Sequence, residues 1–213
     1  MNVSTAVSTA RSYVKVRART VEKFDLRAGT WKVVNAELIH STRIFSSRIS
    51  KQQEEWFIRK ALTAPWDAVP IGSRLIDADP AERGGLYDDA ACLWCHFADV
   101  AIWGIATAKI SKVLHAMRPT FFPVLDKRLV TEFRELAVDA AVRLRDIRSD
   151  RLAFWAAIRH DLLDKQIFLN MVRAELCADE CERVRTWSGH VSDVRLHDVL
   201  MWSPPEITDT YNP

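Results

Sequence analysis

Apolar positions recur at spacings of three and four residues along much of the chain, which is the pattern of amphipathic helices. In the clearest run, residues 107–117, one face carries four apolar residues: Ile110, Val113, Leu114 and Met117. We expect Lys109 and Lys112 to point outward from this helix. An apolar segment, 119–125, then delivers Asp126 to the start of another helix.

The same spacing predicts further helices on both sides of this run, at residues 50–64, 87–100, 126–145, 149–185 and 192–203. Ser50 and the pair Ser149-Asp150 have the composition of helix starts, and Gly189 is expected to break the helical pattern. In the helix after Ser50, four residues are expected in the core: Trp56, Phe57, Ile58 and Leu62. Residues 65–85 are rich in Pro, Gly and Asp and are predicted to form a loop.

These elements predict an all-α fold, and the length of the chain allows two helical lobes that share a core. Hydrophobic residues make up 48% of the 213 residues and include eight tryptophans, which is ample material for a core, while only six glycines argue against a turn-rich β fold. We therefore expect 1–213 to be a single helical domain. It divides into a basic N-terminal arm (1–45), a central region around Asp126 (86–145) and C-terminal helices (149–203).

Charge is distributed unevenly along the chain. The net charge is only +2, yet positive charge is concentrated in residues 1–60 and 101–135, whereas 61–100 and 136–213 carry an acidic excess. Such asymmetry suits a surface that contacts nucleic acid, and a solvated helix surface of mixed charge is the alternative. No apolar run reaches the roughly 18–20 residues that span a bilayer, and no signal peptide is evident, so we expect a cytoplasmic protein without membrane contact.

Four cysteines form two spaced pairs, Cys92 with Cys95 and Cys177 with Cys181. A zinc site would require the two pairs to meet in space, and both lie in helical patterns, where cysteine is often a small buried apolar residue. We expect no metal and no cofactor, with a site formed by the joined pairs as the alternative.

The stretch 102–133 combines a tight turn at Gly104, a lysine-bearing helix and a lone carboxylate, Asp126. A short turn at a helix N-terminus exposes unpaired backbone N–H groups, which can hold a phosphate where glycine allows close approach. The simplest alternative is a buried turn between two core helices, with Asp126 acting only as a helix cap.

The sequence Gly104-Ile105-Ala106, followed by the lysine-bearing helix and by FPVLD ending at Asp126, resembles the helix-hairpin-helix DNA glycosylases, the superfamily of endonuclease III and the adenine glycosylases. Asp126 follows Gly104 by 22 residues, which matches that family without a gap. The run SKVLHAMRPTFFPVLDKRL also resembles a group of uncharacterised bacterial proteins. The chain departs from the superfamily at Trp103, a proline there, and at Ala106, a glycine there. A third departure is Lys127-Arg128, where Thr-His is common.

This resemblance implies a helix-hairpin-helix element that grips double-stranded DNA while Asp126 assists removal of a flipped base. The residues it assigns to DNA contact are Trp103, Gly104, Ile105, Ala106, Thr107, Lys109, Lys112, Lys127 and Arg128. The exposed aromatic Trp103 suits a wedge against the duplex, and Ser111 lies beside Lys112 as a further phosphate contact. We expect a monomer acting in DNA repair or in defence against phage with modified DNA.

Some members of that superfamily also cut the backbone with a lysine, and Ala108 occupies the matching position here. The resemblance therefore implies a monofunctional enzyme that leaves an abasic site. Base recognition requires aromatic and hydrogen-bonding groups, for which the candidates are Trp66, Tyr87, Trp94 and His96. Two alternatives remain: a non-catalytic helix-hairpin-helix DNA-binding protein, and a helical scaffold in which 102–130 is only core.

Overall fold

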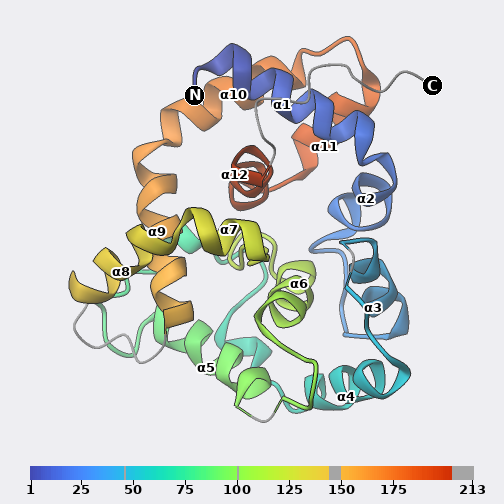
Figure 1. Cartoon of the computed structure of the whole chain (residues 1–213), viewed down its shortest axis with the longest axis vertical. Coiled ribbons are helices and arrows are strands. Elements are labelled where there is room, and N and C mark those ends of the chain that lie inside the picture. Colours follow the sequence, from blue (N-terminus) through green and yellow to red (C-terminus); the bar gives the residue numbers. More distant parts are fainter. Residues whose placement is uncertain (46, 100, 144–149, 203–213) are drawn as a thin grey trace.

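The computed structural model describes residues 1–45, 47–99, 101–143 and 150–202, and the regular secondary structure of these residues consists of helices (Figure 1). Twelve α-helices and no strand are present in the described ranges, so the predicted all-α class is confirmed. The α-helices are α1 (Val3–Val16), α2 (Ala18–Lys23), α3 (Ala36–Thr42), α4 (Lys51–Ala61), α5 (Leu86–Ala98), α6 (Thr107–Met117), α7 (Lys127–Glu132), α8 (Arg134–Arg143), α9 (Asp150–Asp164), α10 (Gln166–Cys177), α11 (Glu182–His190) and α12 (Asp193–Trp202). Four short 3₁₀ helices lie between them: η1 (Asp25–Arg27), η2 (Arg43–Phe45), η3 (Trp66–Ala68) and η4 (Leu75–Asp77).

The first helix packs against the last three, so segments far apart in sequence lie side by side. Figure 1 shows α1 alongside α10 and α11, with α12 close to both, and α1 contacts all three. The α12 helix also contacts α7 and α9. Residues 1–45, predicted as a basic arm, include α1 to α3, and the apolar side chains Val14, Val21 and Phe24 of this segment are buried in the core.

The helix starts follow from side chains that hydrogen-bond to free backbone amides. Ser50 and Gln53 form a reciprocal capping box at α4, with both bonds at 3.2 Å. Ser192 begins the last helix as predicted, because its Oγ accepts from the Arg195 backbone N–H at 3.1 Å. The predicted cap at Ser149 lies outside the described residues.

An aromatic cluster forms the centre of the core. The Trp155 ring on α9 is fully buried and has four aromatic neighbours at ring-centroid distances of 5.2–6.2 Å: Tyr87, Trp94, Phe121 and Phe122. Aromatic rings of this size dominate core energetics, and edge-to-face pairs add a further 0.5–1.5 kcal/mol, roughly, for each pair. The cluster joins α5, α9 and segment 119–125, and thereby fixes the segment that leads to Asp126.

Several predicted boundaries were wrong. The helix expected over 126–145 is divided at Phe133 into α7 and α8, and the helix expected over 149–185 is divided into α9, α10 and the start of α11. The break between α9 and α10 involves Lys165 alone, and apolar spacing continues across an interruption of one residue, so periodicity does not reveal it. Gly189 does not break α11 but lies in its last turn, directly after the buried residues Trp187 and Ser188.

One residue predicted in the core is at the surface. Leu62 is 80% exposed because α4 ends at Ala61 and Leu62 is the residue that caps it. Phe57, on the same helix, is fully buried as predicted. Within the described ranges, none of the helices has both the length and the apolar character that crossing a membrane requires.

Candidate active site

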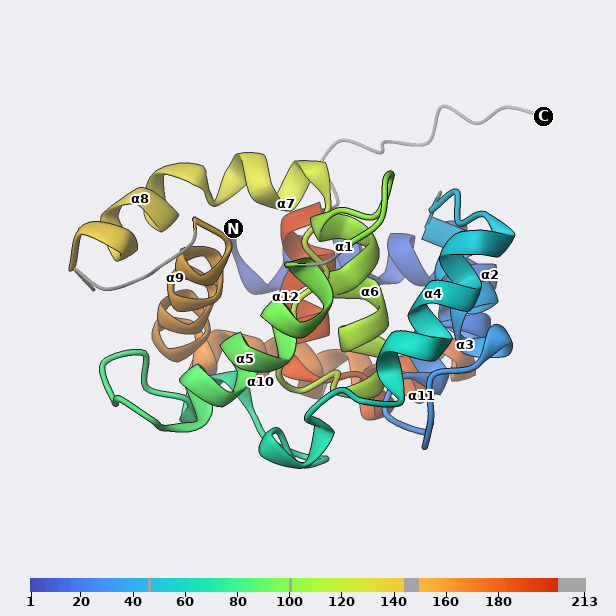
Figure 2. The same ribbon diagram turned by 90° about the horizontal axis from the view of Figure 1, so that it is seen from below.

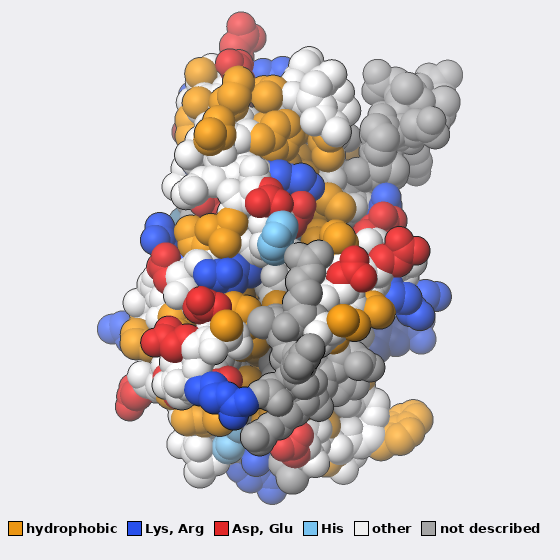
Figure 3. All heavy atoms as spheres, turned by 90° about the vertical axis from the view of Figure 1, so that its left-hand side faces the viewer, with side chains coloured by type: hydrophobic (Ala, Val, Ile, Leu, Met, Phe, Trp, Pro, Cys, Tyr) orange, Lys and Arg blue, Asp and Glu red, His pale blue; other side chains and the backbone are white. Residues whose placement is uncertain are grey.

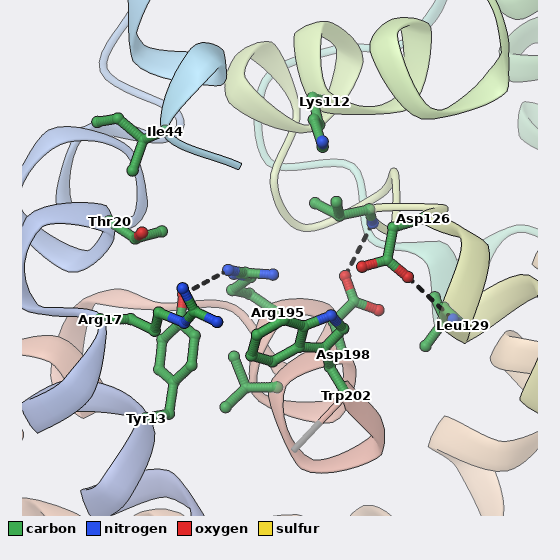
Figure 4. Close-up of a pocket in the computed structure, with 12 residues that line it drawn as sticks. Tyr13, Arg17, Thr20, Ile44, Lys112, Asp126, Leu129, Arg195, Asp198 and Trp202 are labelled. Atoms are coloured by element: carbon green, nitrogen blue, oxygen red, sulfur yellow. Dashed lines mark hydrogen bonds between the residues drawn. The ribbon is translucent and has the colours of Figure 1, made fainter. Parts of the chain in front are cut away.

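A cavity of about 100 Å³ lies where the N-terminal helices meet α6, α7 and α12 (Figure 4). Its ionisable lining residues come from distant parts of the chain: Tyr13, Arg17, Lys112, Asp126, Arg195 and Asp198. Aliphatic and aromatic side chains complete the wall, among them Leu129 and Trp202. A concave site with a few convergent charged groups is the common form of a ligand pocket.

Asp126 stands at the edge of this cavity and at the start of α7. Its Oδ1 accepts hydrogen bonds from the backbone N–H groups of Arg128 at 3.0 Å and Leu129 at 2.9 Å. Asp126 is therefore a helix cap, as the simplest alternative held, and its carboxylate also lines the cavity. The two roles are compatible, because the cap fixes the side chain while leaving part of the carboxylate facing the cavity.

Lys112 lies in the same cavity, and the prediction that it points outward was wrong. It is only 4% exposed, and its Nζ donates to Ser47 Oγ at 2.7 Å. Beyond its first turn α6 has no solvent-facing side, because residues 110–118 are all buried between α3, α5 and the segment that follows. Burial lowers the pKa of Lys112 to about 8, against the opposing effect of the Asp126 charge. Lys109, one turn earlier, stays partly exposed.

The segment before Asp126 is held by two buried side chains. The Val124 backbone N–H donates to Asp198 Oδ2 at 2.8 Å, and the Leu125 N–H donates to Ser111 Oγ at 3.1 Å. Ser111 is thus a structural acceptor in this fold, and not an exposed phosphate contact. Burial raises the pKa of Asp198 to about 7, although the Arg195 guanidinium acts in the opposite direction.

Behind the cavity a buried network joins α12 to the N-terminal helices. The Arg195 guanidinium donates to Asp25 Oδ1 at 2.9 Å and to Tyr13 Oη at 2.6 Å. Asp25 also accepts from Tyr13 Oη at 2.9 Å and from the Trp187 indole N–H at 3.0 Å. Burial raises the pKa of Tyr13, so the phenol stays neutral. The network satisfies a buried charge pair and fixes one wall of the cavity.

The connection between α5 and α6 forms a tight turn at the surface. Gly104 has a φ of 78°, a region that favours glycine, and the Ile105 N–H donates to Ile102 O at 3.0 Å. Trp103 at the tip is 96% exposed. No side chain at the N-cap position, Ala106, accepts a hydrogen bond from the backbone N–H groups in the first turn of α6.

Gln53 braces this turn from α4. Its Nε2 donates to Trp103 O at 3.0 Å, and its Oε1 accepts from Lys109 Nζ at 2.8 Å. A Cβ added at Gly104 would lie 2.7 Å from Gln53 Nε2, so a larger residue there would displace the end of the Gln53 side chain, and the positive φ itself favours glycine. The turn and α7 lie on the same side of the molecule in Figure 2, and Lys127 and Arg128 follow Asp126 directly.

The face formed around α8 and α9 differs from this side. Apolar side chains there are interspersed with charges of both signs (Figure 3), and among the described residues visible in that view neither sign predominates. The exposed apolar residues of α8 and α9 include Val138, Val142 and Leu163. This mixed surface gives no electrostatic reason to place DNA on it.

The four residues predicted for a base pocket do not line the cavity beside Asp126. Tyr87 and Trp94 pack in the core against Trp155. The Trp66 indole N–H donates to Ala61 O at 3.0 Å, and His96 Nε2 lies 2.9 Å from Lys60 O. The Trp66 Nε1 and His96 Nε2 atoms are therefore bound to backbone carbonyl groups in the last turn of α4, and neither residue lines the cavity.

The residues that do line the cavity were missed because most lie near the two ends of the chain. Tyr13 and Arg17 come from the N-terminal helices, and Arg195, Asp198 and Trp202 from α12. The Arg17 guanidinium carbon lies 5.0 Å from the centroid of the Trp202 ring, an attractive cation–π arrangement. The available signal was on α12, where Arg195, His197 and Asp198 interrupt a largely apolar run.

The two cysteine pairs form no disulfide and no joint metal-binding group among the described residues. All four thiols are free, and three of them, Cys92, Cys177 and Cys181, are exposed. Across the residues that the structure describes, no group of three or more His, Cys, Asp or Glu side chains is arranged to hold a metal ion.

Residues 56–204 match a family of unknown function, DUF6308. This range includes Lys112, Asp126 and α12, and it leaves out Tyr13, Arg17 and Asp25. Neither the curated proteins nor the solved structures contain a match to the chain.

Proposed function

We propose a function for this chain, which belongs to the DUF6308 family: it removes a damaged or modified base from double-stranded DNA and leaves an abasic site. One observation supports this above the others. Asp126, the residue that the resemblance selects as catalytic, lines a cavity that also contains Lys112, Arg17 and a second carboxyl group, Asp198.

The chemistry that this cavity suits is cleavage of an N-glycosidic bond. The bond between C1′ of the deoxyribose and the base nitrogen breaks, and its electron pair leaves with the base. Positive charge develops on the sugar, and the fixed carboxylate of Asp126 stabilises it. Water then adds to C1′ and loses a proton, and the departing base takes up one proton, so the products are the abasic sugar and the neutral base.

The α5–α6 turn supplies a contact for the DNA backbone. In this proposal α5, the turn and α6 form the helix-hairpin-helix element, and the two groups of helices on either side of the cavity form two lobes. The uncapped first turn of α6 and the glycine at 104 leave backbone N–H groups open to a phosphate. Lys109, Lys127 and Arg128 add positive charge, and Trp103 extends toward the duplex.

The product is an abasic site, in the monofunctional form of the reaction. Ala108 occupies the position of the lysine that cuts the backbone in the similar superfamily. Lys112 lies four residues later, on the same face of α6 and within the cavity. One control tests whether Lys112 forms a Schiff base with the abasic sugar. Strand cleavage without alkali, together with a covalent adduct trapped by borohydride, would show that the enzyme is bifunctional.

The test is incubation of the whole protein with duplexes that each carry one damaged or modified base, followed by alkali to cleave abasic sites. Base release from at least one duplex, abolished in Asp126→Asn, is the expected result. DNA binding without release from any duplex would favour the alternative, a non-catalytic helix-hairpin-helix protein. In this proposal the protein acts as a cytoplasmic monomer, in repair or in defence against modified phage DNA.

A further inference from the structure

Asp198 is a buried carboxyl group of the cavity that neither the sequence pattern nor the proposed reaction uses. It is 2% exposed and lies on α12. Its Oδ2 accepts from the Val124 N–H at 2.8 Å, two residues before Asp126. Together with Ser111, which holds the next amide, it fixes the path of the backbone that presents Asp126.

The two carboxyl groups lie together on the cavity wall and have different surroundings (Figure 4). Asp126 accepts two backbone N–H groups at the start of a helix, an arrangement that stabilises negative charge. Asp198 accepts one, and its Oδ1 is buried with no hydrogen-bond partner among the described residues. Two neighbouring carboxyl groups with unequal donors hold a shared proton on the poorer site.

Charged groups reach Asp198 from every side of the cavity. Arg195 on the same helix favours its ionised form, while Asp126 and Asp25 disfavour it. The Arg195 guanidinium already donates to Asp25 and to Tyr13. Two more cations line the cavity, Arg17 of the N-terminal helices and Lys112 of α6. Burial is the largest influence, and it raises the pKa of Asp198 to about 7.

We propose that Asp198 is the positioning residue for Asp126, and that it carries the single proton of a carboxyl pair whose negative charge stays on Asp126. This rests on the proposed function in that Asp126 is the group facing the reacting sugar. While Asp198 is neutral, it holds the Val124 amide without repelling the neighbouring carboxylate. A cation in the cavity stabilises the ionised form of Asp198, so binding of a cationic ligand is coupled to release of this proton.

The first test measures titration of the free protein by NMR of carbonyl-labelled aspartates, with the Asp198 signal assigned from Asp198→Asn. We expect an Asp198 midpoint near pH 7 and a clear fall in that midpoint in Asp126→Asn, which removes the adjacent charge. A midpoint near that of an ordinary aspartate, or a midpoint unaffected by Asp126→Asn, would overturn the paired arrangement.

The second test uses two DNA duplexes that differ only at one position, a cationic pyrrolidine or a neutral tetrahydrofuran abasic analogue. The pyrrolidine resembles the charged sugar of the transition state. For wild type, the preference for pyrrolidine over tetrahydrofuran should rise roughly tenfold between pH 6 and pH 7.5, because binding releases a proton. Asp198→Asn should show the preference without this rise. The control Asp161→Asn, a substitution of another partly buried carboxyl group on α9, should behave as wild type.

Positioning is tested by hydrogen exchange at the Val124 amide. Asparagine keeps an oxygen that accepts from this N–H, so the Val124 amide should stay protected in Asp198→Asn. In Asp198→Ala, the protection factor of this amide should fall by roughly tenfold or more. Equal protection in the alanine variant would remove the positioning role. If neither duplex binds at all, the proposed function fails, while the titration and the exchange still decide the inference about Asp198.

Discussion

Arg195 and Asp25 form a buried ion pair, with Nε to Oδ1 at 2.9 Å, although 170 residues separate them in sequence. The pair joins α12 to the short helix after α2, and Tyr13 and Trp187 complete its hydrogen bonds. The wall of the cavity therefore depends on both ends of the described chain. Asp25 lies outside the residues that match the family, whereas Arg195 lies inside them.

The ion pair should contribute strongly to stability. Asp25→Asn leaves Arg195 buried without its counter-charge, and breaking such a pair destabilises by about 3–5 kcal/mol. Urea unfolding followed by tryptophan fluorescence measures the difference. The matched control is Glu37→Gln, which breaks the exposed pair with Arg27 and should change the free energy of unfolding by less than about 1 kcal/mol. Equal effects of the two substitutions would contradict the structural role of the buried pair.

Asp126→Asn separates an enzyme from a binding protein. Asparagine keeps an oxygen that can accept from the Arg128 and Leu129 amides, so the variant should stay folded and bind DNA. It lacks the negative charge, so base release should fall at least ~100-fold on a duplex from which the wild type releases base. Single-turnover release at matched DNA saturation is the measurement. Undiminished release would leave Asp126 as a helix cap alone.

Lys109 should contribute to DNA affinity without affecting sequence preference. Lys109→Glu places a negative charge beside the α5–α6 turn, so affinity should fall for every duplex and the salt dependence should become shallower. The control is Lys32→Glu, because Lys32 is also exposed but lies in the loop after η1. This loop is bound to the opposite end of α6 from the turn, since the Gly29 N–H donates to Ala116 O. Fluorescence anisotropy at several salt concentrations compares the two. A similar loss in both variants would indicate a general charge effect instead of a contact at the turn.

Trp103 should matter for DNA and not for folding. Because its side chain is 96% exposed, Trp103→Ala should change the free energy of unfolding by less than about 0.5 kcal/mol. Affinity for duplex DNA should fall about tenfold, the scale of one lost stacking or wedge contact. Leu62→Ala is the matched control, since Leu62 is also highly exposed but lies at the end of α4. Unchanged DNA affinity in Trp103→Ala would show that the tip of the turn does not contact DNA.

Lys112 should make stability depend on pH in the alkaline range. Its pKa is lowered in the folded protein to about 8, below that of an exposed lysine, so the folded state loses its proton first. Stability should therefore rise with pH from about 8 to about 10.4, by roughly 3 kcal/mol, relative to a variant without the amine. Urea unfolding of wild type and Lys112→Met across this range measures the difference. A constant difference would mean that the amine is better solvated than its burial indicates.

Local patterns predicted local features well. The bounds of α6 agree with the expected 107–117, because Gly104 sets the turn and the apolar spacing is uninterrupted. The position of Asp126 at a helix start was also predicted, since the apolar segment before it leaves a polar residue at the next possible cap. The burial of Lys112 was not predicted, because it depends on which elements pack around α6. The spacing of apolar residues within the helix carries no information about those elements.

The composition of the cavity wall could not be read from proximity in sequence. Tyr87 and Trp94 are aromatic residues near the turn, but an aromatic on an amphipathic helix looks the same whether it faces a cavity or Trp155. Arg195 and Asp198 lie about 70 residues after Asp126 and meet it only through the packing of α12. Buried charges on an apolar helix were the one usable sign.

The participation of α12 in the cavity has a consequence for biosynthesis. Asp198 holds the Val124 amide, and Arg195 holds Asp25 and Tyr13, so α1 and the segment before Asp126 lack these partners until residues 193–202 have left the ribosome. The bonds that join α4 to the turn and to α6 are available earlier, because Gln53, Trp103 and Lys109 all precede Asp126 in the chain. The surface that we assign to phosphate thus forms during translation, whereas the carboxyl pair is assembled only after the last described helix emerges.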